Sequence, residues 1–261
     1  ERSPFNTKNI GAYKQLKKIM KDEKYDIVHC HTPVGGILAR LAGRKFRKDG
    51  LRMIYTAHGF HFYDGAPKKN WIIYYPIEKF MSRYTDDLIT ITEEDYKLAK
   101  DRNFKGNIHH VHGVGVNTDK FVKLSEEDRQ KLRVDKGYTN EFIILCTGEL
   151  NKNKNQDTLI KAMKEVVKKH PEAKLLLAGN GPEHDNLVKL IEELNLGDNV
   201  ELLGYRTDIQ DYVNICNLVV SASYREGLPL NIMEAMICGK PVIASDNRGH
   251  RELIKNNKNG K

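Results

Sequence analysis

The sequence contains no long apolar run. Its 261 residues are 39% hydrophobic and 30% charged, and no apolar stretch reaches the ~20 residues that a helix needs to cross a bilayer. A recognisable signal peptide, internal repeats and low-complexity tracts are absent as well. Apolar residues are spread along the whole length, which argues against a disordered chain. We therefore expect a folded protein without a transmembrane helix, long enough for two domains of ordinary size.

Cysteine is scarce too. The four cysteines are Cys30, Cys146, Cys216 and Cys238. They form no CxxC pair and lie in apolar surroundings, which is typical of small buried side chains in a reducing compartment rather than of disulfides or zinc ligands. The acidic pair Asp86-Asp87 precedes an apolar run, so we interpret it as a turn that leads into a strand. We expect a cytoplasmic protein that holds no metal or other cofactor.

The net charge of +8 is unevenly distributed along the chain. Residues 1–140 carry 27 Lys and Arg against 18 Asp and Glu, whereas residues 141–261 carry 16 against 17. A basic first half favours contact with an anionic membrane surface or an anionic acceptor. A generally basic protein surface explains the charge equally well, because no tight polybasic cluster stands out. We rank nucleic-acid binding low, because the basic residues are scattered and no nucleic-acid-binding motif is present.

Short apolar runs alternate with amphipathic segments of helical length from one end to the other. The runs are rich in Ile, Val and Leu, and they suit strands that are buried on both faces of a parallel sheet. We predict strands over 26–31, 52–58, 87–92, 108–112, 142–148, 174–179, 199–203, 218–223 and 241–245. We predict helices over 8–24, 35–48, 70–84, 93–103, 156–169, 184–195, 208–216 and 230–238, and a short charged helix within 125–137.

This strand–helix–strand order predicts an α/β fold with right-handed crossovers and doubly wound sheets. The strands are too many for one small sheet, so we predict two Rossmann-like domains that face each other across a cleft. We place an N-terminal domain at 1–120, a linker region at 121–140 and a C-terminal domain at 141–261. The chain begins before any predicted strand and stops in a polar turn, so we expect both domains to be incomplete at the termini.

The most informative segment is SYREGLPLNIMEAM, residues 223–236, which follows a predicted strand and opens a predicted helix. Gly227 permits a tight loop, and Pro229 suits the first helical turn, where a missing N–H does no harm. The backbone N–H groups at 230–232 would then be free. Together with the helix dipole they favour an anion such as a diphosphate.

Two carboxylates flank this helix start. Glu226 precedes it, and Glu234 lies inside the helix, about 7 Å along the axis at ~1.5 Å per residue. Such a pair does not suit a dyad that shares one proton. It suits two separate hydroxyl-bearing parts of one elongated ligand, because carboxylates accept hydrogen bonds from vicinal hydroxyls. We assign a ribose diol to Glu234 and a sugar hydroxyl to Glu226; two solvated surface glutamates are the alternative.

The spacing Glu226-x7-Glu234 in REGLPLNIMEAM resembles the signature of glycosyltransferase family 4, which are retaining enzymes with two facing Rossmann-like domains (the GT-B fold). Further segments match it in order: TGELNKNKNQ (147–156), LLLAGNGPEHDNL (175–187), ELLGYRTDI (201–209) and GKPVIASDNRGHRELI (239–254). The first half, with YDIVHCHTPVGGILARLAGR and YTAHGFHFYDGAP, resembles the acceptor-side domain of members that build capsular polysaccharide or exopolysaccharide.

The resemblance implies roles on the donor side. Glu234 would hold the ribose hydroxyls and Glu226 a hydroxyl of the transferred sugar, with a part in catalysis. Lys154 would contact the diphosphate, where a cation neutralises charge on the leaving group. The other donor-binding positions that we infer are Gly148, Gly181, Tyr205, Arg206, Gly227, Leu228, Pro229 and Leu230. Relatives carry an Arg where this chain has Glu149, so we expect this carboxylate to point away from the phosphate or to pair with Lys152.

Histidines lie at the ends of predicted strands in the first half. His29 and His31 alternate along one strand and therefore share one face, and we expect them to line a cleft or a core rather than to bind a metal. The resemblance assigns His58 to contact with the transferred sugar and to catalysis. We place His31 and His61 on the acceptor side; a packed loop residue is the alternative for His61.

The resemblance thus implies transfer of a sugar, with retention of configuration, from a nucleoside diphosphate sugar to a hydroxyl acceptor. We expect the acceptor to be a lipid-linked glycan at the cytoplasmic face of the membrane, in capsular polysaccharide or exopolysaccharide synthesis. Two alternatives stay open. One is a nucleotide-sugar 2-epimerase of similar architecture, and the other is a non-catalytic nucleotide-sugar-binding protein, which Glu149 favours.

Overall fold

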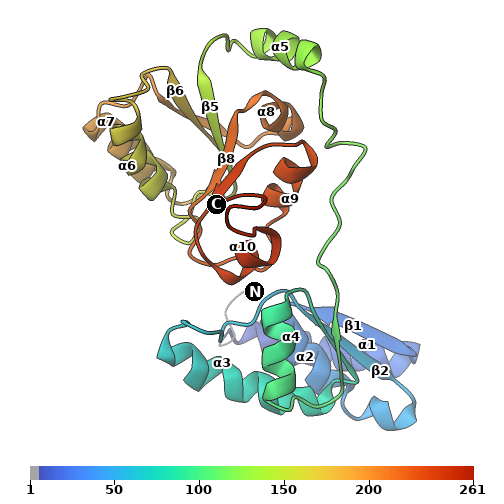
Figure 1. The fold of residues 1–261 in the computed structure, drawn as a ribbon. Helices are drawn as coiled ribbons and strands as arrows, with labels where there is room; N and C mark the ends of the chain where they lie inside the picture. The colour runs from blue at the N-terminus through green and yellow to red at the C-terminus, as the bar shows by residue number, and fades with distance from the viewer. Residues whose placement is uncertain (1–5) are drawn as a thin grey trace. The chain divides into compact units, whose positions relative to one another are not determined.

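The protein divides into two compact units. The structure is a computed structural model that describes residues 6–261. The first unit ends at Gly113 and the second begins at Val114, and each has its own sheet and hydrophobic core (Figure 1). Among residues 6–261, no helix combines the length and the apolar character that crossing a membrane requires.

The first unit is a parallel four-stranded sheet with helices packed on it (Figure 1). Its strands, in spatial order, are β1 (Ile27–His31), β2 (Arg52–Ala57), β3 (Asp87–Thr90) and β4 (Asn107–His110). Its helices are α1 (Lys8–Glu23), α2 (Pro33–Gly43), α3 (Lys68–Met81) and α4 (Glu93–Asp101), with short 3-10 helices η1 (Phe46–Asp49) and η2 (Ser82–Tyr84). Helix α2 packs on β1 and β2 and contacts α1, whereas α4 packs on β3 and β4.

The core of the first unit is centred on β2. Met53, Tyr55 and Ala57 are each at most 2% exposed and pack with the phenylalanines that follow the strand. Strand β1 lies at the edge of the described sheet and is buried on one face only: Ile27 is 56% exposed, and Cys30 is buried. Our expectation of burial on both faces therefore fails for β1.

The second unit is a parallel five-stranded sheet, ordered β7-β6-β5-β8-β9. The strands are β5 (Phe142–Thr147), β6 (Ala173–Ala178), β7 (Val200–Gly204), β8 (Leu218–Ser221) and β9 (Val242–Ala244). The helices are α5 (Glu126–Asp135), α6 (Gln156–Val166), α7 (His184–Glu193), α8 (Ile209–Ile215), α9 (Leu230–Ile237) and α10 (Arg248–Leu253). Figure 1 shows α6 and α7 together on one side of this sheet and α8 and α9 on the other.

Alternate residues of β5 face two separate hydrophobic layers. Ile143 and Leu145 belong to the cluster that α8 and α9 complete, whereas Ile144 and Cys146 belong to the cluster that α6 and α7 complete. All four are buried. A period of two with an apolar residue at every position is what a strand between two helical layers requires, so the prediction of burial on both faces is confirmed here.

All nine predicted strands are present, with ends that differ by at most two residues. Helix α10 was not predicted. All four cysteines are buried and unpaired, as expected, and burial raises the pKa of the Cys30 thiol to about 11.

The predicted linker region 121–140 contains α5, whose Arg129 and Arg133 donate hydrogen bonds to the Asn214 and Ile215 carbonyl oxygens at 3.2 and 2.9 Å. This helix is packed on the second unit, and the unit boundary lies at Gly113.

Candidate active site

The order of strands in the second unit reverses between β5 and β8. From β5 the chain proceeds outward through β6 and β7, and it then returns to the other side of β5 as β8 and β9. In open parallel sheets this reversal leaves a crevice beyond the carboxyl ends of the two neighbouring strands, where ligands bind. The loops that follow Thr147 and Ser221 border this crevice, and they contain part of the predicted site, including Gly148, Lys154 and Glu226.

Two glycines let the loops after β5 and β6 approach each other closely. Gly148 and Gly179 have φ values of 147° and 148°, and a Cβ on Gly179 would lie 2.0 Å from the Gly148 carbonyl oxygen. A Cβ on Gly181 would lie 2.2 Å from the Leu150 oxygen. A side chain at either Gly179 or Gly181 would overlap this backbone, so the floor of the crevice is formed by main chain.

A pocket of about 540 Å³ opens above this floor. It brings together four predicted donor-binding residues: Gly148, Tyr205, Arg206 and Glu234. Its other lining residues are Lys120, Thr147, Glu149, Ala178, Gly179, Asn180, Thr207 and Ile209. Gly148 and Glu234, which are more than 80 positions apart in the sequence, therefore line the same cavity.

Glu234 is half-buried on α9 at the side of this pocket. Burial raises the pKa of its carboxyl group, and Lys120 partly opposes this shift. Lys120 also donates a hydrogen bond to the Thr207 carbonyl oxygen at 3.3 Å. A partly desolvated carboxylate binds hydroxyl groups more strongly than one in bulk water, so Glu234 is suited to a diol. Lys120 is a cation of the pocket that the sequence did not single out.

Lys154 and Glu226 are paired with each other. Lys154 Nζ lies 2.7 Å from Glu226 Oε1, and their side chains are 22% and 14% exposed. The loops that carry them are joined by backbone contacts, because Tyr224 N donates to Asn153 O at 2.8 Å and Asn153 Nδ2 donates to Arg225 O at 2.9 Å. Sequence reasoning assigned the two residues to different groups of one ligand, and the structure places them side by side.

Helix α9 begins where the predicted range 230–238 begins, but Pro229 is not part of its first turn. Pro229 is the N-cap and the helix begins at Leu230. The N–H of Ile232 donates to the Pro229 carbonyl oxygen at 3.2 Å, so only two of the three expected free groups, those of Leu230 and Asn231, are left for an anion among the described residues. Asn231 Nδ2 donates to the Thr147 carbonyl oxygen at 3.1 Å and thus holds the helix start against the end of β5.

Other predicted donor-side residues lie on the loop before α9 or at the rim. Gly227 and Leu228 are half-buried, Pro229 is buried, and Tyr205 is 75% exposed. The guanidinium group of Arg206 forms a bidentate ion pair with Asp208 at 2.8 and 2.9 Å. We expected the Glu149 carboxylate to point away from the phosphate or to pair with Lys152. It accepts a hydrogen bond from the Asn151 side chain instead, at 3.0 Å.

Helix α10 adds residues to the site that sequence reasoning missed. Asn247 caps the helix by accepting the His250 N–H at 3.1 Å, and it donates to the Ser223 carbonyl oxygen at 2.9 Å. A Cβ on Gly249 would lie 2.5 Å from the Gly227 oxygen. This segment therefore supports the Glu226 loop from behind. Asn247, which lies two residues after the predicted strand 241–245, is the capping signal that could have revealed this helix.

His250 is 2% exposed, and burial lowers the pKa of its imidazole. Its Nδ1 lies 2.6 Å from the Ser245 carbonyl oxygen, so this nitrogen carries the proton in the neutral ring. Its Nε2 is buried and has no hydrogen-bond partner among the residues described. Buried polar atoms normally have a hydrogen-bond partner. His250 Nε2 is an exception, and it lies in the segment that supports the Glu226 loop.

In the first unit, three histidines meet at the carboxyl ends of β1 and β2. His31 Nδ1 lies 2.9 Å from His58 Nε2, and the His29 and His31 ring centroids are 4.3 Å apart. His29 and His31 share one face of β1 as predicted, and both are exposed, so neither is a core residue. Burial and the neighbouring His31 lower the pKa of His58, which favours a neutral imidazole able to accept or donate a hydrogen bond.

His61, predicted on the acceptor side, packs on a helix of the same unit. Its ring centroid lies 4.6 Å from that of Tyr74 on α3, and its carbonyl oxygen accepts a hydrogen bond from Asn70 at 2.8 Å. These contacts fix the loop between β2 and α3. They fit the alternative of a packed loop residue, and they leave its acceptor role as a prediction.

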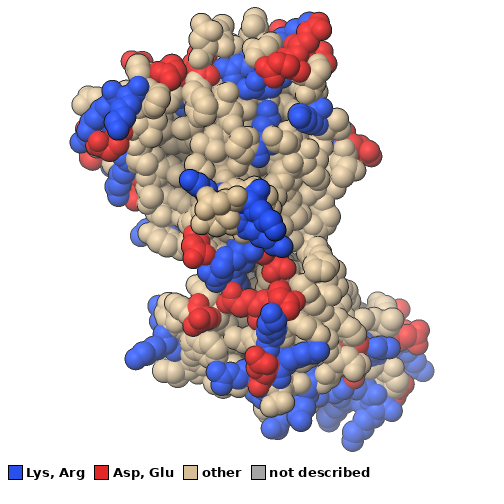
Figure 2. Space-filling model, viewed as in Figure 1, with Lys and Arg blue, Asp and Glu red and all other residues tan. Residues whose placement is uncertain are grey.

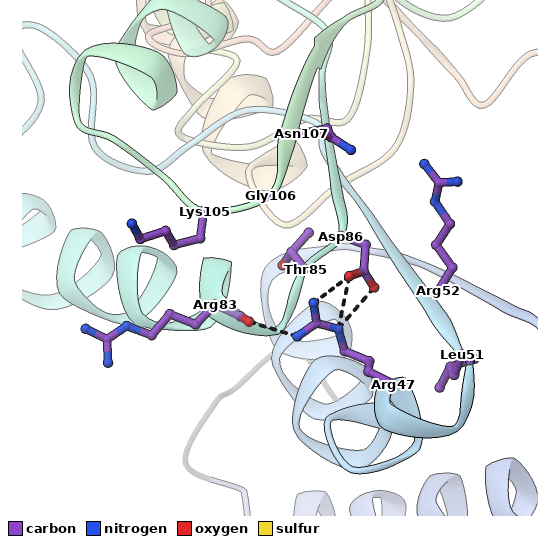
Figure 3. Close-up of a pocket in the computed structure, with 10 residues that line it drawn as sticks. Arg47, Leu51, Arg52, Arg83, Thr85, Asp86, Lys105, Gly106 and Asn107 are labelled. Atoms are coloured by element: carbon purple, nitrogen blue, oxygen red, sulfur yellow. Dashed lines mark hydrogen bonds and ion pairs between the residues drawn. The ribbon is translucent and has the colours of Figure 1, made fainter.

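The acidic pair at 86–87 lies at the opposite, amino-terminal edge of the first sheet. Figure 3 shows Asp86 held by the Arg47 guanidinium group in a pocket lined by further basic side chains. Asp87 begins β3 and is bound by Arg52 at 2.6 Å and by His109 at 2.9 Å, and the Arg52 hydrogen bond holds the pKa of Asp87 well below its usual range. The interpretation of this pair as a turn into a strand is confirmed.

A doubly wound sheet whose switch point carries a main-chain floor, a lysine and two spaced carboxylates fits the class of enzymes that act on nucleotide-linked sugars. Comparison with known proteins agrees. The family model described as glycosyl transferases group 1 matches residues 125–261, and the one described as glycosyl transferase 4-like matches residues 1–92.

Individual relatives match along nearly the whole chain. The Bacillus subtilis protein EpsD, whose name describes it as a glycosyltransferase, is 47% identical over 261 residues, which is 99% of this chain and 68% of EpsD. An Escherichia coli UDP-Gal:alpha-D-GlcNAc-diphosphoundecaprenol alpha-1,3-galactosyltransferase is 30% identical, over 98% of this chain and 68% of that protein. The solved structure of Anabaena HepE in complex with UDP superposes with a TM-score of 0.79 at 24% identity, over 96% of this chain and 67% of that one.

The chain therefore belongs to the glycosyl transferases group 1 family and is a glycosyltransferase. Its α/β architecture with parallel sheets is that of GT-B enzymes. The expected family is confirmed. The 2-epimerase alternative is not supported, because the named relatives are glycosyltransferases.

Proposed function

We propose that this protein moves a sugar from a nucleoside diphosphate sugar to a hydroxyl group of a lipid-linked glycan, with retention of configuration, at the cytoplasmic face of a membrane. The observation that carries the donor half is the pocket at the β5–β8 switch point, which joins Gly148, Gly179 and Glu234 beside the Lys154–Glu226 pair. The acceptor half is supported by the name of the E. coli relative, which specifies a diphosphoundecaprenol-linked acceptor.

In this proposal Glu234 accepts hydrogen bonds from the ribose diol. The diphosphate lies over the main-chain floor, near the N–H groups of Leu230 and Asn231, and Lys154 turns from Glu226 to the phosphate. Lys154 then neutralises the charge that develops as the bond between the anomeric carbon and the phosphate oxygen breaks. Glu226, released from the lysine, accepts a hydrogen bond from the transferred sugar.

The acceptor hydroxyl attacks the same face of the sugar that the phosphate leaves. Its proton passes to the departing phosphate oxygen, so one C–O bond breaks, one forms, and no side chain is left with the proton. His58 orients the transferred sugar, and His31 fixes the His58 ring through their 2.9 Å contact. We include no metal ion or other cofactor in this proposal, because Lys154 supplies the positive charge at the diphosphate.

Replacement of Glu234 tests the donor site. In calorimetric titrations of the intact protein with UDP-, GDP- and ADP-sugars, with and without a chelator, we expect one donor to bind and Glu234→Ala to weaken it about 10- to 100-fold, because two hydrogen bonds to an ionised group are lost. The matched control is Glu192→Ala, an exposed carboxylate on α7. Wild-type affinity in Glu234→Ala would remove the assignment, and binding that the chelator abolishes would contradict the metal-free part.

A second candidate, a nucleotide-sugar binder without catalysis, is favoured by one observation: the Glu149 carboxylate lines the pocket. A negative charge near a diphosphate opposes donor binding and leaving-group departure alike. The two candidates differ in turnover. Donor that is bound but neither transferred to a lipid-linked acceptor nor hydrolysed by the intact protein would favour the second.

A further inference from the structure

The imidazole ring of His250 can take up a proton at one nitrogen only. Its Nδ1 lies 2.6 Å from the Ser245 carbonyl oxygen, and at this distance the nitrogen donates its proton to the oxygen. Its Nε2 is buried and has no hydrogen-bond partner within residues 6–261. In the neutral ring Nε2 is therefore an unused acceptor, and it becomes a donor when the ring is charged.

Closely packed main chain holds this ring beside the Glu226 loop. The side chains of Asn247 and Ser245 donate hydrogen bonds to the Ser223 carbonyl oxygen at 2.9 and 2.6 Å, and they tie the start of α10 to the segment that leads to Glu226. A Cβ built on Gly249 would lie only 2.7 Å from Glu226 Cβ. The backbone at residues 249 and 226 is thus in direct contact, and the His250 ring cannot move away from Glu226 without disturbing this packing.

Two opposite charges act on the His250 ring. Burial is the largest cause of its shifted pKa and lowers it; the hydrogen bond to Ser245 and the Glu226 carboxylate raise the pKa, and the Lys154 ammonium group lowers it. Because Lys154 Nζ lies 2.7 Å from Glu226 Oε1, the fields of these two charges largely cancel at the ring. Burial then decides the balance, and the ring is neutral near neutral pH.

The other charged side chains around α10 act on the ring less strongly. Glu234, on the neighbouring α9, lines the donor pocket, and the Arg248 guanidinium group donates to the Glu226 carbonyl oxygen at 3.3 Å. Asp246 and Arg251 pair with each other at 2.9 Å and are exposed. Figure 2 shows basic and acidic side chains together at the surface around α10. Salt and water screen such exposed charges far more than buried ones, so the partly buried lysine–glutamate pair has the larger influence.

Donor binding, in the mechanism of the proposed function, removes the balance within that pair. The diphosphate brings further negative charge, and Lys154 turns from Glu226 to the phosphate. The Glu226 carboxylate is then left without its lysine in a partly buried position, where an uncompensated charge is costly. A proton on His250 Nε2 supplies the missing positive charge on the same side of the loop.

We propose that His250 takes up a proton from solvent when the donor binds, and that the charged ring compensates Glu226 while Lys154 is engaged with the phosphate. The ring releases this proton when the nucleoside diphosphate leaves and the lysine returns, so it gains and loses none over one turnover. His250 is thus a positioning residue, which acts on the transferred sugar through Glu226. This inference rests on the proposed function, because it needs a donor that draws Lys154 away from Glu226.

Coupling to a proton makes donor affinity depend on pH. The pKa of the His250 ring is lowered before the donor binds and is higher in the complex, so the complex holds more protons between the two values. Affinity therefore rises as pH falls through this interval. We expect the donor to bind about 3- to 10-fold more tightly at about pH 5.5 than at about pH 7.5.

The test is calorimetric titration of the intact protein with the nucleotide sugar that binds best in a panel of UDP-, GDP- and ADP-sugars. Titrations at about pH 6.5, where a histidine exchanges protons, are run in PIPES and in imidazole, because these buffers differ in their heat of ionisation and supply the proton. The diphosphate of a nucleotide sugar is esterified at both ends and exchanges no proton near neutral pH. We expect the wild type to take up roughly 0.3 to 1 proton per donor bound.

Matched variants identify the group that takes up the proton. His250→Gln removes the titrating ring and should bind the donor with almost no proton uptake and little dependence of affinity on pH. Glu226→Gln keeps the histidine but removes the carboxylate that attracts the proton, so its uptake should fall well below that of the wild type even where His250→Gln does not fold. His58→Gln, in the first unit, and His170→Gln, at an exposed site, should keep the wild-type uptake.

The outcomes separate this inference from the proposed function. Donor binding by the wild type without proton uptake would overturn the inference and leave the donor site in place. Wild-type uptake in His250→Gln would assign the proton to another group, and wild-type uptake in Glu226→Gln would remove the link to the carboxylate; each overturns the inference as well. Failure of every nucleotide sugar in the panel to bind would contradict the proposed function itself, and the inference with it.

Discussion

The two units present their functional residues in different ways. In the second unit the crevice floor is main chain that two glycines bring together, and the side chains around it are held by hydrogen bonds to neighbouring loops. In the first unit the corresponding strand ends carry exposed histidines that mainly contact one another. The difference fits the division of work that we propose, in which the second unit recognises the donor through a fixed shape and histidines of the first unit take part in the reaction.

The largest expected effect comes from filling the crevice floor. Gly179→Ala places a Cβ 2.0 Å from the Gly148 oxygen at a φ of 148°, so the two loops must separate. We expect the free energy of unfolding to fall by about 2–4 kcal/mol and donor binding to be lost. Urea unfolding and calorimetry measure the two effects.

Gly197→Ala is the control for this substitution, because nothing lies within 4 Å of a Cβ built there. Its unfolding free energy should stay within about 0.5 kcal/mol of the wild type. If Gly179→Ala behaves like Gly197→Ala, the crevice floor is not the rigid element that the comparison assumes.

A smaller effect, mainly on turnover, is expected in the first unit. His58→Ala should lower kcat about 100-fold or more, which is a usual range for a positioned imidazole, and should weaken donor binding by a much smaller factor, because the second unit holds the nucleotide in our proposal. Steady-state transfer rates and calorimetry separate the two quantities. His170→Ala, an exposed histidine on the second unit, serves as control. A loss of donor affinity equal to the loss of rate would remove the proposed division of work.

The smallest expected effect is a pH dependence of stability in the second unit. Burial lowers the pKa of His250 in the folded state, so the unfolded chain takes up its proton first as pH falls. The stability that the neutral ring contributes is complete above about pH 6.5 and is lost as pH falls toward the lower folded pKa.

Replacement of His250 by Gln removes this titration. We expect the free energy of unfolding of His250→Gln to decline less than that of the wild type between about pH 7 and 5, as measured by urea unfolding at several pH values. His170→Gln, at an exposed site, should show the wild-type slope. Parallel curves for wild type and His250→Gln would mean that the buried ring does not contribute to the pH dependence.

The sequence predicted the strands well because their signal is local. Runs such as IILC at 143–146 are apolar at every position, and only a strand between two layers buries all of them. The positions of Gly148, Glu234 and Arg206 in one pocket followed from matching a family pattern. The six-residue helix α10 escaped prediction because it is too short to show a hydrophobic period, and its capping residue Asn247 lies within a polar segment.

Other features depend on contacts between distant residues and could not be predicted. The Lys154–Glu226 pair joins residues 72 positions apart, and the buried Arg40–Glu78 pair joins two helices. From the sequence alone, WIIYYPIEKF at 71–80 indicates an amphipathic helix but not which side faces inward. That choice is made by the ion pair with Arg40, and it is what leaves the isoleucines exposed.

The contact between Lys154 and Glu226 lowers the desolvation cost of binding a nucleotide. Each half-buried charge is already compensated, so neither must be stripped of a full water shell when a nucleotide arrives. The lysine merely exchanges one anion for another, and the glutamate becomes available at the same moment. Removing Glu226 would therefore strengthen phosphate binding by Lys154 and lower the rate of sugar transfer. Nucleotide affinity alone would then misrepresent the activity of a variant at residue 226.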